Sequence, residues 1–263
     1  MLENNNFDEV VMKRHTAREF DPEITISKGE LLQIITYATK APSALNMQPT
    51  RFVVAQNNAA KEKIASVAGT NAPEILSASA VVLIGGELDL GPFEDDLFKR
   101  AATAGLLTDR AVEHQKPMID HLVADFKQDK QALREFIIQN SSLAAMSLML
   151  AARAYGYETG PMTGFDHEKI LPALDLDPAH FMPTLLIAIG KPKNAPDSLY
   201  RIPASKVTVF KLIVNDITIY FEKRACHMIF IMNLDRVLLG LYLKLYSAFA
   251  NGVVPNKIGR AHV

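Results

Sequence analysis

Residues 137–155 read IIQNSSLAAMSLMLAARAY and form the most apolar helical pattern in the chain. Apolar side chains occur on almost every side of this pattern, which is typical of a helix buried on several sides. Gly156 follows directly, and glycine is favoured just beyond a helix end because the backbone is often left-handed there. We therefore expect a central helix over residues 137–155, with other elements packed around it.

Three continuous apolar runs predict buried strands, and they cover residues 51–55, 79–86 and 184–189. A helix is predicted after Ser27, which stands three residues before a glutamate as in a capping box. More polar helical patterns cover the following ranges: 7–13, 57–67, 93–104, 111–126 and 168–174. A last strand is expected at 207–210.

The bulk composition excludes several classes of partner. The chain has 263 residues and a formal net charge of −1, so no overall field attracts nucleic acid or an anionic membrane. The single cysteine, Cys226, rules out an internal disulfide and a cysteine-based metal cluster. No uncharged apolar run is long enough to span a bilayer, and the polar first residues do not resemble a signal peptide. We expect a cytoplasmic protein with no nucleic-acid or membrane partner.

Residues 41–49 read APSALNMQP and join a predicted helix to the strand at 51–55. The two prolines, Pro42 and Pro49, remove backbone donors and favour extended conformations in the residues before them. Such a segment is a fixed loop that presents hydroxyl, amide and backbone groups to a flat ligand with a polar edge. The alternative is a plain connection between a helix and a strand.

Residues 14–18 read RHTAR. Arg14 and Arg18 are four residues apart and would share a face if they lay on a helix end. Together with the donors of His15 and Thr16 they would form a clamp for a phosphate group. The alternative is a solvated basic turn.

Residues 160–165 read GPMTGF, and their two glycines allow the backbone to approach a ligand without an intervening Cβ. Asp166 is expected to cap the helix that follows. Asn71 lies in a turn, where capping of the next helix is favoured over contact with a ligand.

Four acidic and imidazole side chains on the helical pattern at 111–126 are candidate metal ligands: His114, Asp120, His121 and Asp125. Their spacing lacks the paired histidines of an HExxH-type zinc site, and their polar surroundings favour a solvated helix face. We therefore expect no metal site.

Four motifs occur in a fixed order: RHTxRxF at 14–20, APSxxNxQP at 41–49, PMxGFD at 161–166 and RxP at 201–203. Together they resemble the FMN-dependent nitroreductase family, over residues 7–210. The resemblance implies an α+β fold with a central, mostly antiparallel sheet flanked by helices. It also implies a homodimer with a long helical interface and one FMN at each of two clefts between the subunits.

The resemblance assigns the charged residues to the phosphate end of the cofactor. Arg14, His15, Thr16 and Arg201 would hold the phosphate and ribityl chain of FMN. Arg18 would lie near the pyrimidine edge of the flavin. Three arginines suit a phosphate dianion, because guanidinium groups donate strong, paired hydrogen bonds to it.

The neutral residues would surround the flavin ring. The partner subunit would contribute part of the loop at 41–49, with the following candidates: Pro42, Ser43, Ala44, Asn46 and the supporting Gln48. Asn71 would face the uracil-like edge. Backbone groups at Thr163 and Gly164, next to Met162, would donate to N5 and O4.

The sequence departs from the family at three positions. Glu74 stands where many relatives have a lysine near the flavin O2, which bears on how strongly the reduced, anionic flavin is stabilised. Leu199 stands where some relatives have a second phosphate-binding lysine, which leaves Arg201 with one positive charge fewer beside it at the phosphate. Thr163 replaces a frequent glutamate.

The implied activity is that of an NAD(P)H oxidoreductase in which FMN carries the redox step and no side chain acts as acid or base. NAD(P)H would reduce flavin N5 and leave, and a nitroaromatic, a quinone or a similar acceptor would then occupy the same cleft, which predicts ping-pong kinetics. One alternative is a flavin-binding store or sensor without turnover. Another is a related flavin enzyme that dehalogenates its substrate or fragments the flavin.

The C-terminal segment 212–263 does not fit the family, so we expect a functional domain at 1–211 followed by a tail. Within the tail, residues 211–221 predict a strand and residues 228–249 an apolar helix that is interfacial or packed in a core. Residues 257–263 read KIGRAHV, like the translation of a sequencing adapter. Read-through is the favoured interpretation, and an arm around the partner subunit is the alternative.

Overall fold

A four-stranded antiparallel sheet lies at the centre of the computed structural model, which describes residues 2–195, 199–214 and 217–220. The strand order is β1-β2-β4-β3. The bounds are β1 (Thr50–Ala55), β2 (Ala80–Glu87), β3 (Glu158–Met162) and β4 (Phe181–Gly190). The three strands predicted from apolar runs are confirmed as β1, β2 and β4.

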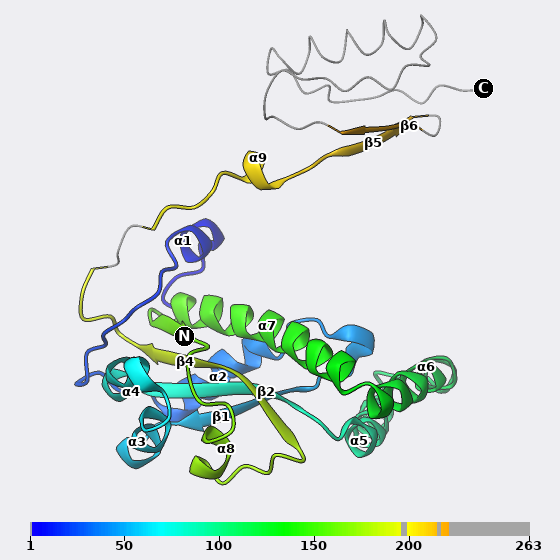
Figure 1. The fold of residues 1–263 in the computed structure, drawn as a ribbon, viewed down its shortest axis with the longest axis horizontal. Helices are drawn as coiled ribbons and strands as arrows, with labels where there is room; N and C mark the ends of the chain where they lie inside the picture. The colour runs from blue at the N-terminus through cyan, green and yellow to red at the C-terminus, as the bar shows by residue number, and fades with distance from the viewer. Residues whose placement is uncertain (1, 196–198, 215–216, 221–263) are drawn as a thin grey trace, which may run out of the picture. The chain divides into compact units, whose positions relative to one another are not determined.

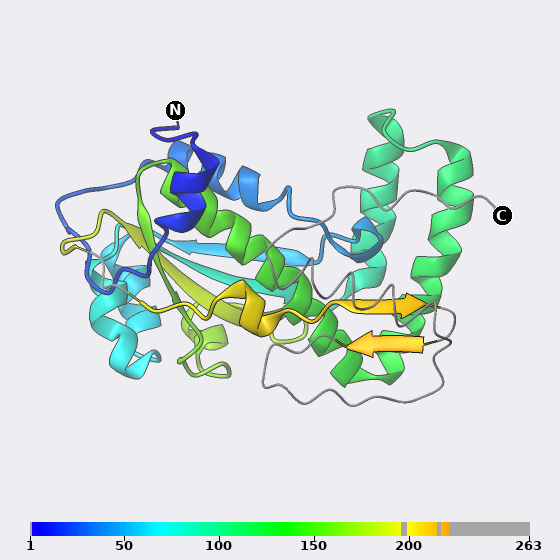
Figure 2. The same ribbon diagram turned by 90° about the horizontal axis from the view of Figure 1, so that it is seen from above.

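Helices cover both faces of this sheet (Figure 1). Their bounds are α1 (Phe7–Met12), α2 (Lys28–Ala38), α3 (Asn58–Ala65), α4 (Ala72–Ser77), α5 (Leu90–Thr103), α6 (Asp109–Gln128), α7 (Lys130–Ala154) and α8 (Ile170–Ala173). Two 3-10 turns are η1 (Ala44–Asn46) and η2 (Gly69–Asn71). Figures 1 and 2 show α7 along one face, α3, α4 and α8 on the other, and α5 beside α6 beyond one end of the sheet.

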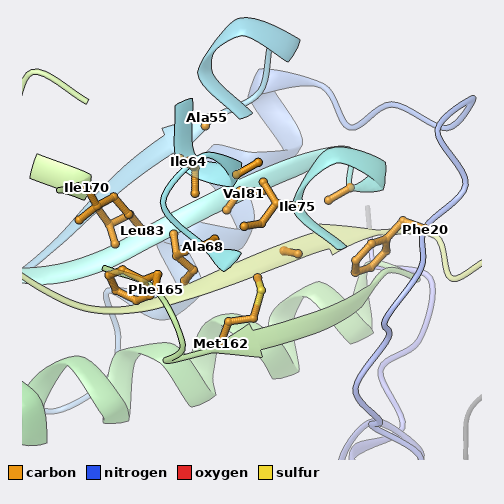
Figure 3. Packing of buried hydrophobic residues seen from close by; sticks show 14 of the residues in the cluster. Phe20, Ala55, Ile64, Ala68, Ile75, Val81, Leu83, Met162, Phe165 and Ile170 are labelled. Atoms are coloured by element: carbon orange, nitrogen blue, oxygen red, sulfur yellow. The ribbon is translucent and has the colours of Figure 1, made fainter. Parts of the chain in front are cut away.

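Strand β2 is buried on both faces, which explains its unbroken apolar sequence. Val81 and Leu83 belong to the core under α3 and α4 (Figure 3), whereas Val82 and Ile84 belong to the core under α2 and α7. Successive side chains of a strand point to opposite faces, so one run of residues supplies both cores. Complete burial of each such aliphatic side chain stabilises the fold by roughly 1.5–3 kcal/mol.

Helix α7 begins seven residues earlier than predicted. Asp129 caps it, with its Oδ1 accepting from the backbone N–H of Gln131 and Ala132 at 3.0 Å each. Its end is as predicted, since Gly156 follows with a φ of 80°. The described residues leave part of this helix uncovered, because Ile138, Leu143 and Met146 form an exposed apolar stripe.

Two predicted elements differ from the structure. Residues 158–162 are strand β3, paired with β4, and the end of this strand overlaps the loop expected at 160–165. The strand was not predicted because Gly160 and Pro161 weaken the strand pattern at the edge of a sheet. Residues 207–210 are not a strand, and the helix α9 (Ala204–Val207) occupies the start of that range. Asp166 caps the turn before α8 as expected, accepting from Lys169 N at 3.0 Å.

The chain divides into two compact units, Met1–Ser198 and Leu199–Val263. The described part of the second unit contains α9 and a hairpin of β5 (Lys211–Val214) and β6 (Ile217–Tyr220), where one strand was predicted. The helix predicted at 228–249 and the segment 257–263 lie outside the described residues. Within the described ranges no helix has the length and apolar character needed to cross a membrane.

Candidate functional site

The arginine-containing segment 14–18 runs beside the edge strand β3. Thr16 forms an isolated parallel bridge with Thr159, and the Ala17 N–H donates to the Thr159 carbonyl at 3.1 Å. The condition that Arg14 and Arg18 lie on a helix end is not met, since α1 stops at Met12 and the segment joins the sheet edge instead.

His15 is held from its Nδ1 side. This nitrogen lies 3.2 Å from the Lys13 carbonyl oxygen and 3.5 Å from Glu158 Oε1. Glu158 is itself buried and forms an ion pair with Arg153 at the end of α7. The other ring nitrogen, His15 Nε2, is buried and has no hydrogen-bond partner among the described residues. Buried polar atoms of this kind are rare and are expected where a ligand or a second subunit supplies the partner.

Arg18 is anchored by the buried carboxylate of Glu74 on α4. Arg18 Nη1 donates to Glu74 Oε2 at 3.1 Å, while 67% of the Arg18 side chain is exposed. Burial raises the pKa of Glu74, and the Arg18 guanidinium opposes that rise. A Cβ on Gly160 would collide with Glu74 Oε1, so Gly160 serves this carboxylate instead of the ligand approach expected from the sequence.

Asn71 and Gly164 meet at an open hollow of about 420 Å³. Asn71 Nδ2 donates to the Gly164 carbonyl at 2.7 Å and makes no cap bond to α4, so the capping expectation is wrong. Thr163 and Gly164 are exposed, and the side chains of Met162 and Phe165 turn into the core (Figure 3). Thr163 and Gly164 are therefore the part of this turn that is accessible from outside.

The loop at 41–49 has an unusual backbone. Leu45, Asn46 and Gln48 have φ values of 52°, 56° and 50°, in the left-handed region that non-glycine residues seldom occupy. Ser43 Oγ accepts from the Gln48 N–H at 2.9 Å, and Arg51 Nη1 donates to the Gln48 carbonyl at 3.0 Å. Strain of this kind persists where surrounding contacts impose it, and it is concentrated at functional sites.

Asn140 of α7 also anchors this loop, and the sequence motifs did not include it. Its Oδ1 accepts from the Ala44 N–H at 3.1 Å, and its Nδ2 donates to the Phe136 carbonyl at 2.7 Å. The side chain is buried at 5% exposure. A buried amide within an otherwise apolar helix face was the available signal, because such a group requires hydrogen-bond partners.

Among the described residues, the two halves of the predicted site are anchored at different parts of α7. The loop residues, including Pro42, Ser43, Ala44, Asn46 and Gln48, lie near Asn140, in the first half of α7. The segment 14–18 lies beside β3, which follows the end of α7 at Ala154. Fourteen helical residues separate Asn140 from Ala154, a rise of about 21 Å.

Arg201 belongs to the second unit, where its Nη1 donates to the Tyr200 carbonyl at 3.3 Å and its side chain is exposed. Leu199, in the same unit, is also exposed. The role of Arg201 at the phosphate stays a prediction.

Residues 11–191 match the sequence profile of the nitroreductase family. The chain belongs to this family. A Bacillus subtilis (strain 168) relative named as an NAD(P)H nitroreductase, YdgI, is 34% identical over 212 residues, which are 80% of this chain and 100% of the relative. A Lactiplantibacillus plantarum relative, the CLA biosynthesis enone reductase, is 34% identical and covers 80% of this chain and 96% of its own length.

A solved structure from Exiguobacterium sibiricum 255-15, described as a nitroreductase in complex with FMN, has a TM-score of 0.76 and 31% identity. It covers 80% of this chain and 100% of its own. The predicted family, α+β fold and oxidoreductase class are confirmed by these matches. FMN in this relative bears out the predicted cofactor class.

The residues present fit FMN. The buried, unpartnered His15 Nε2 lies between the two arginines of segment 14–18 in sequence, which suits an anionic group at this edge. The exposed turn at Thr163 and Gly164 suits the polar rim of a flat ring system. When it is bound, FMN supplies transfer of a hydride equivalent from NAD(P)H to a second substrate.

Proposed function

We propose that this protein is an FMN-dependent NAD(P)H oxidoreductase that reduces nitroaromatics, quinones or similar acceptors in two alternating half-reactions. The observation that supports it most directly is the grouping of segment 14–18, Asn71 and Gly164 around strand β3, within a family whose solved relative contains FMN.

The residues divide the binding work. Arg14, His15 and Thr16 bind the phosphate end, where donors and positive charge are concentrated. Arg18 and Asn71 orient the pyrimidine edge. The backbone at Thr163 and Gly164 donates to the reactive edge, as oriented peptide groups do without any change in protonation.

We further propose a homodimer in which each cofactor site takes the loop at 41–49 from the partner subunit. Two observations support it. The exposed stripe of Ile138, Leu143 and Met146 offers an apolar face for a second copy of α7. A two-fold axis across antiparallel α7 helices would bring the Asn140 end of one subunit toward the Ala154 end of the other.

The visible spectrum of the purified protein tests the cofactor assignment. Wild-type protein is expected to show oxidised flavin absorbance that bleaches on anaerobic addition of NADH or NADPH and returns with menadione. A colourless protein that does not take up added FMN would contradict the proposal. A yellow protein that fails to oxidise NAD(P)H with any acceptor would favour the flavin store or sensor.

Initial-velocity kinetics test the alternation of substrates. Double-reciprocal plots at several acceptor concentrations are expected to be parallel, because NAD(P)⁺ leaves before the acceptor binds. Intersecting lines would show that both substrates bind together and would rule out one shared cleft.

A conjugated enone is a second candidate acceptor, favoured by 34% identity to an enone reductase. Comparison of kcat/KM for a nitrofuran, menadione and an enone fatty acid under identical conditions ranks the three. A cytoplasmic location remains our expectation, and fractionation of the natural host tests it.

A further inference from the structure

The ion pair between Glu74 and Arg18 combines a buried carboxylate with an exposed guanidinium group. Glu74 is 4% exposed, and its Oε2 accepts the hydrogen bond of Arg18 Nη1 at 3.1 Å. Its Oε1 is buried without a hydrogen-bond partner among the described residues. The exposed Arg18 guanidinium is thus held by a carboxylate that solvent does not reach.

Gly160 leaves the space that this carboxylate fills. A Cβ there would collide with Glu74 Oε1 and would lie 2.7 Å from the Ala17 carbonyl oxygen. Strand β3, the backbone before Arg18 and helix α4 therefore meet at one point. Asn71, which directly precedes α4, donates to the carbonyl of Gly164, which follows β3. The segments next to α4 and β3 therefore line the hollow at Gly164.

The pair is a poor source of folding stability. Burial disfavours the ionised form of Glu74 and raises its pKa. The attraction to Arg18 is screened by water, because most of the arginine side chain is exposed. The Glu74–Arg18 contact therefore adds little to the stability of the fold. Its main physical effect is to fix the direction of the long, flexible Arg18 side chain.

We propose that Glu74 is a positioning residue that holds the Arg18 guanidinium at the edge of the FMN site, so that Arg18 meets the cofactor already oriented. This inference rests on the proposed function. Arg18 binds the cofactor without having to lose its rotamer freedom on binding, a cost that otherwise weakens association.

The test is a double-mutant cycle on FMN affinity, measured by quenching of flavin fluorescence during titration of the apoprotein. Glu74→Gln is expected to weaken FMN binding about three- to tenfold, because Arg18 is no longer held. In the Arg18→Ala background the same substitution is expected to have no weakening effect. Glu74→Asp keeps the charge with a shorter side chain and is expected to lie between wild type and Glu74→Gln.

The thermal midpoint of the apoprotein separates positioning from structural support. Glu74→Gln removes a buried charge, so the midpoint is expected to stay the same or rise while FMN affinity falls. A structural role would lower both together. Glu19→Gln is the matched control, since Glu19 is the neighbouring carboxylate, accepts Lys193 Nζ at 2.5 Å and lies outside the site. Its FMN affinity is expected to equal that of wild type.

Two outcomes overturn the inference and leave the proposed function standing. One is FMN binding by Glu74→Gln that equals or exceeds wild type, as expected if Glu74 only repels an anionic ligand. The other is unchanged FMN binding by Arg18→Ala. Failure of the wild-type protein itself to bind FMN would overturn both proposals. Glu74→Asp carries the test alone if Glu74→Gln does not fold.

Discussion

Segment 14–18 and the loop at 41–49 are both predicted to contact one cofactor, yet they are built on different physical principles. The first is rich in charge and is held by buried carboxylates, Glu74 under Arg18 and Glu158 beside His15. The second is neutral in its own side chains and is held in a left-handed backbone by amide and hydroxyl groups together with the Arg51 guanidinium. The difference indicates a division of labour, in which one half of the site supplies electrostatic attraction and the other supplies shape.

The largest expected effect is on the charged half. Arg14→Ala is expected to weaken FMN binding roughly 100-fold, because loss of one partner in a charged, hydrogen-bonded contact costs about 2–5 kcal/mol. The protein is expected to purify colourless, and Arg201→Ala likewise. Flavin content per subunit, measured on freshly purified protein, checks this. Full occupancy in both variants would show that these arginines do not hold the phosphate.

Mixed dimers test whether the two halves come from different subunits. Arg14→Ala and Asn46→Ala subunits are each expected to form impaired homodimers. A heterodimer isolated with two different tags would have one site with both defects and one site with neither, so it is expected to bind about half of the wild-type FMN at wild-type affinity. If every site in the heterodimer is impaired, both halves come from the same chain.

The neutral half is tested at its anchor. Asn140→Ala leaves the Ala44 N–H unpaired and is expected to lower the free energy of unfolding by about 1–3 kcal/mol. It is also expected to weaken FMN binding, because Asn140 no longer holds the loop at 41–49 in its left-handed conformation. Thr103→Ala on α5 is the control, since the Thr103 hydroxyl is exposed, bonds to its own helix at the Lys99 carbonyl and lies on a different helix from the exposed stripe of α7. Urea unfolding and FMN titration of both variants give the two quantities.

The smallest expected effect is a pH dependence of apoprotein stability. Because burial raises the pKa of Glu74 above its ordinary 4.5, the folded state holds this proton more tightly than the unfolded state. The stability from the protonated acid is complete below pH 4.5 and is lost as the pH rises through the raised pKa. Glu74→Gln lacks this loss, so the difference between its thermal midpoint and that of wild type is expected to grow as the pH rises from 4.5 through the raised pKa. Parallel curves over that range would contradict the assigned direction.

Sequence reasoning reached the parts of the molecule that periodicity and motif order determine. Continuous apolar runs located β1, β2 and β4, and the helical pattern with Gly156 located the end of α7. Motif order predicted the family. Each of these signals is local, or depends on sequence order alone.

Contacts between distant residues were not predictable in the same way. Strand β3 was missed because Gly160 and Pro161 resemble a turn until their partner strand β4 is known. The capping role expected for Asn71 was wrong because Gly164, 93 residues away, accepts its hydrogen bond. Asn140 was missed because the backbone N–H that it binds belongs to Ala44, 96 residues away in the sequence.

The space that Gly160 leaves for Glu74 also restricts how this protein can change. A side chain cannot be added at position 160 while the glutamate remains, because both would occupy one volume. Replacing Glu74 by a smaller residue would remove this clash, but a Cβ at position 160 would still lie 2.7 Å from the Ala17 carbonyl oxygen. Position 160 is therefore restricted twice, by a side chain and by a backbone group, and saturation libraries at this position are expected to return glycine.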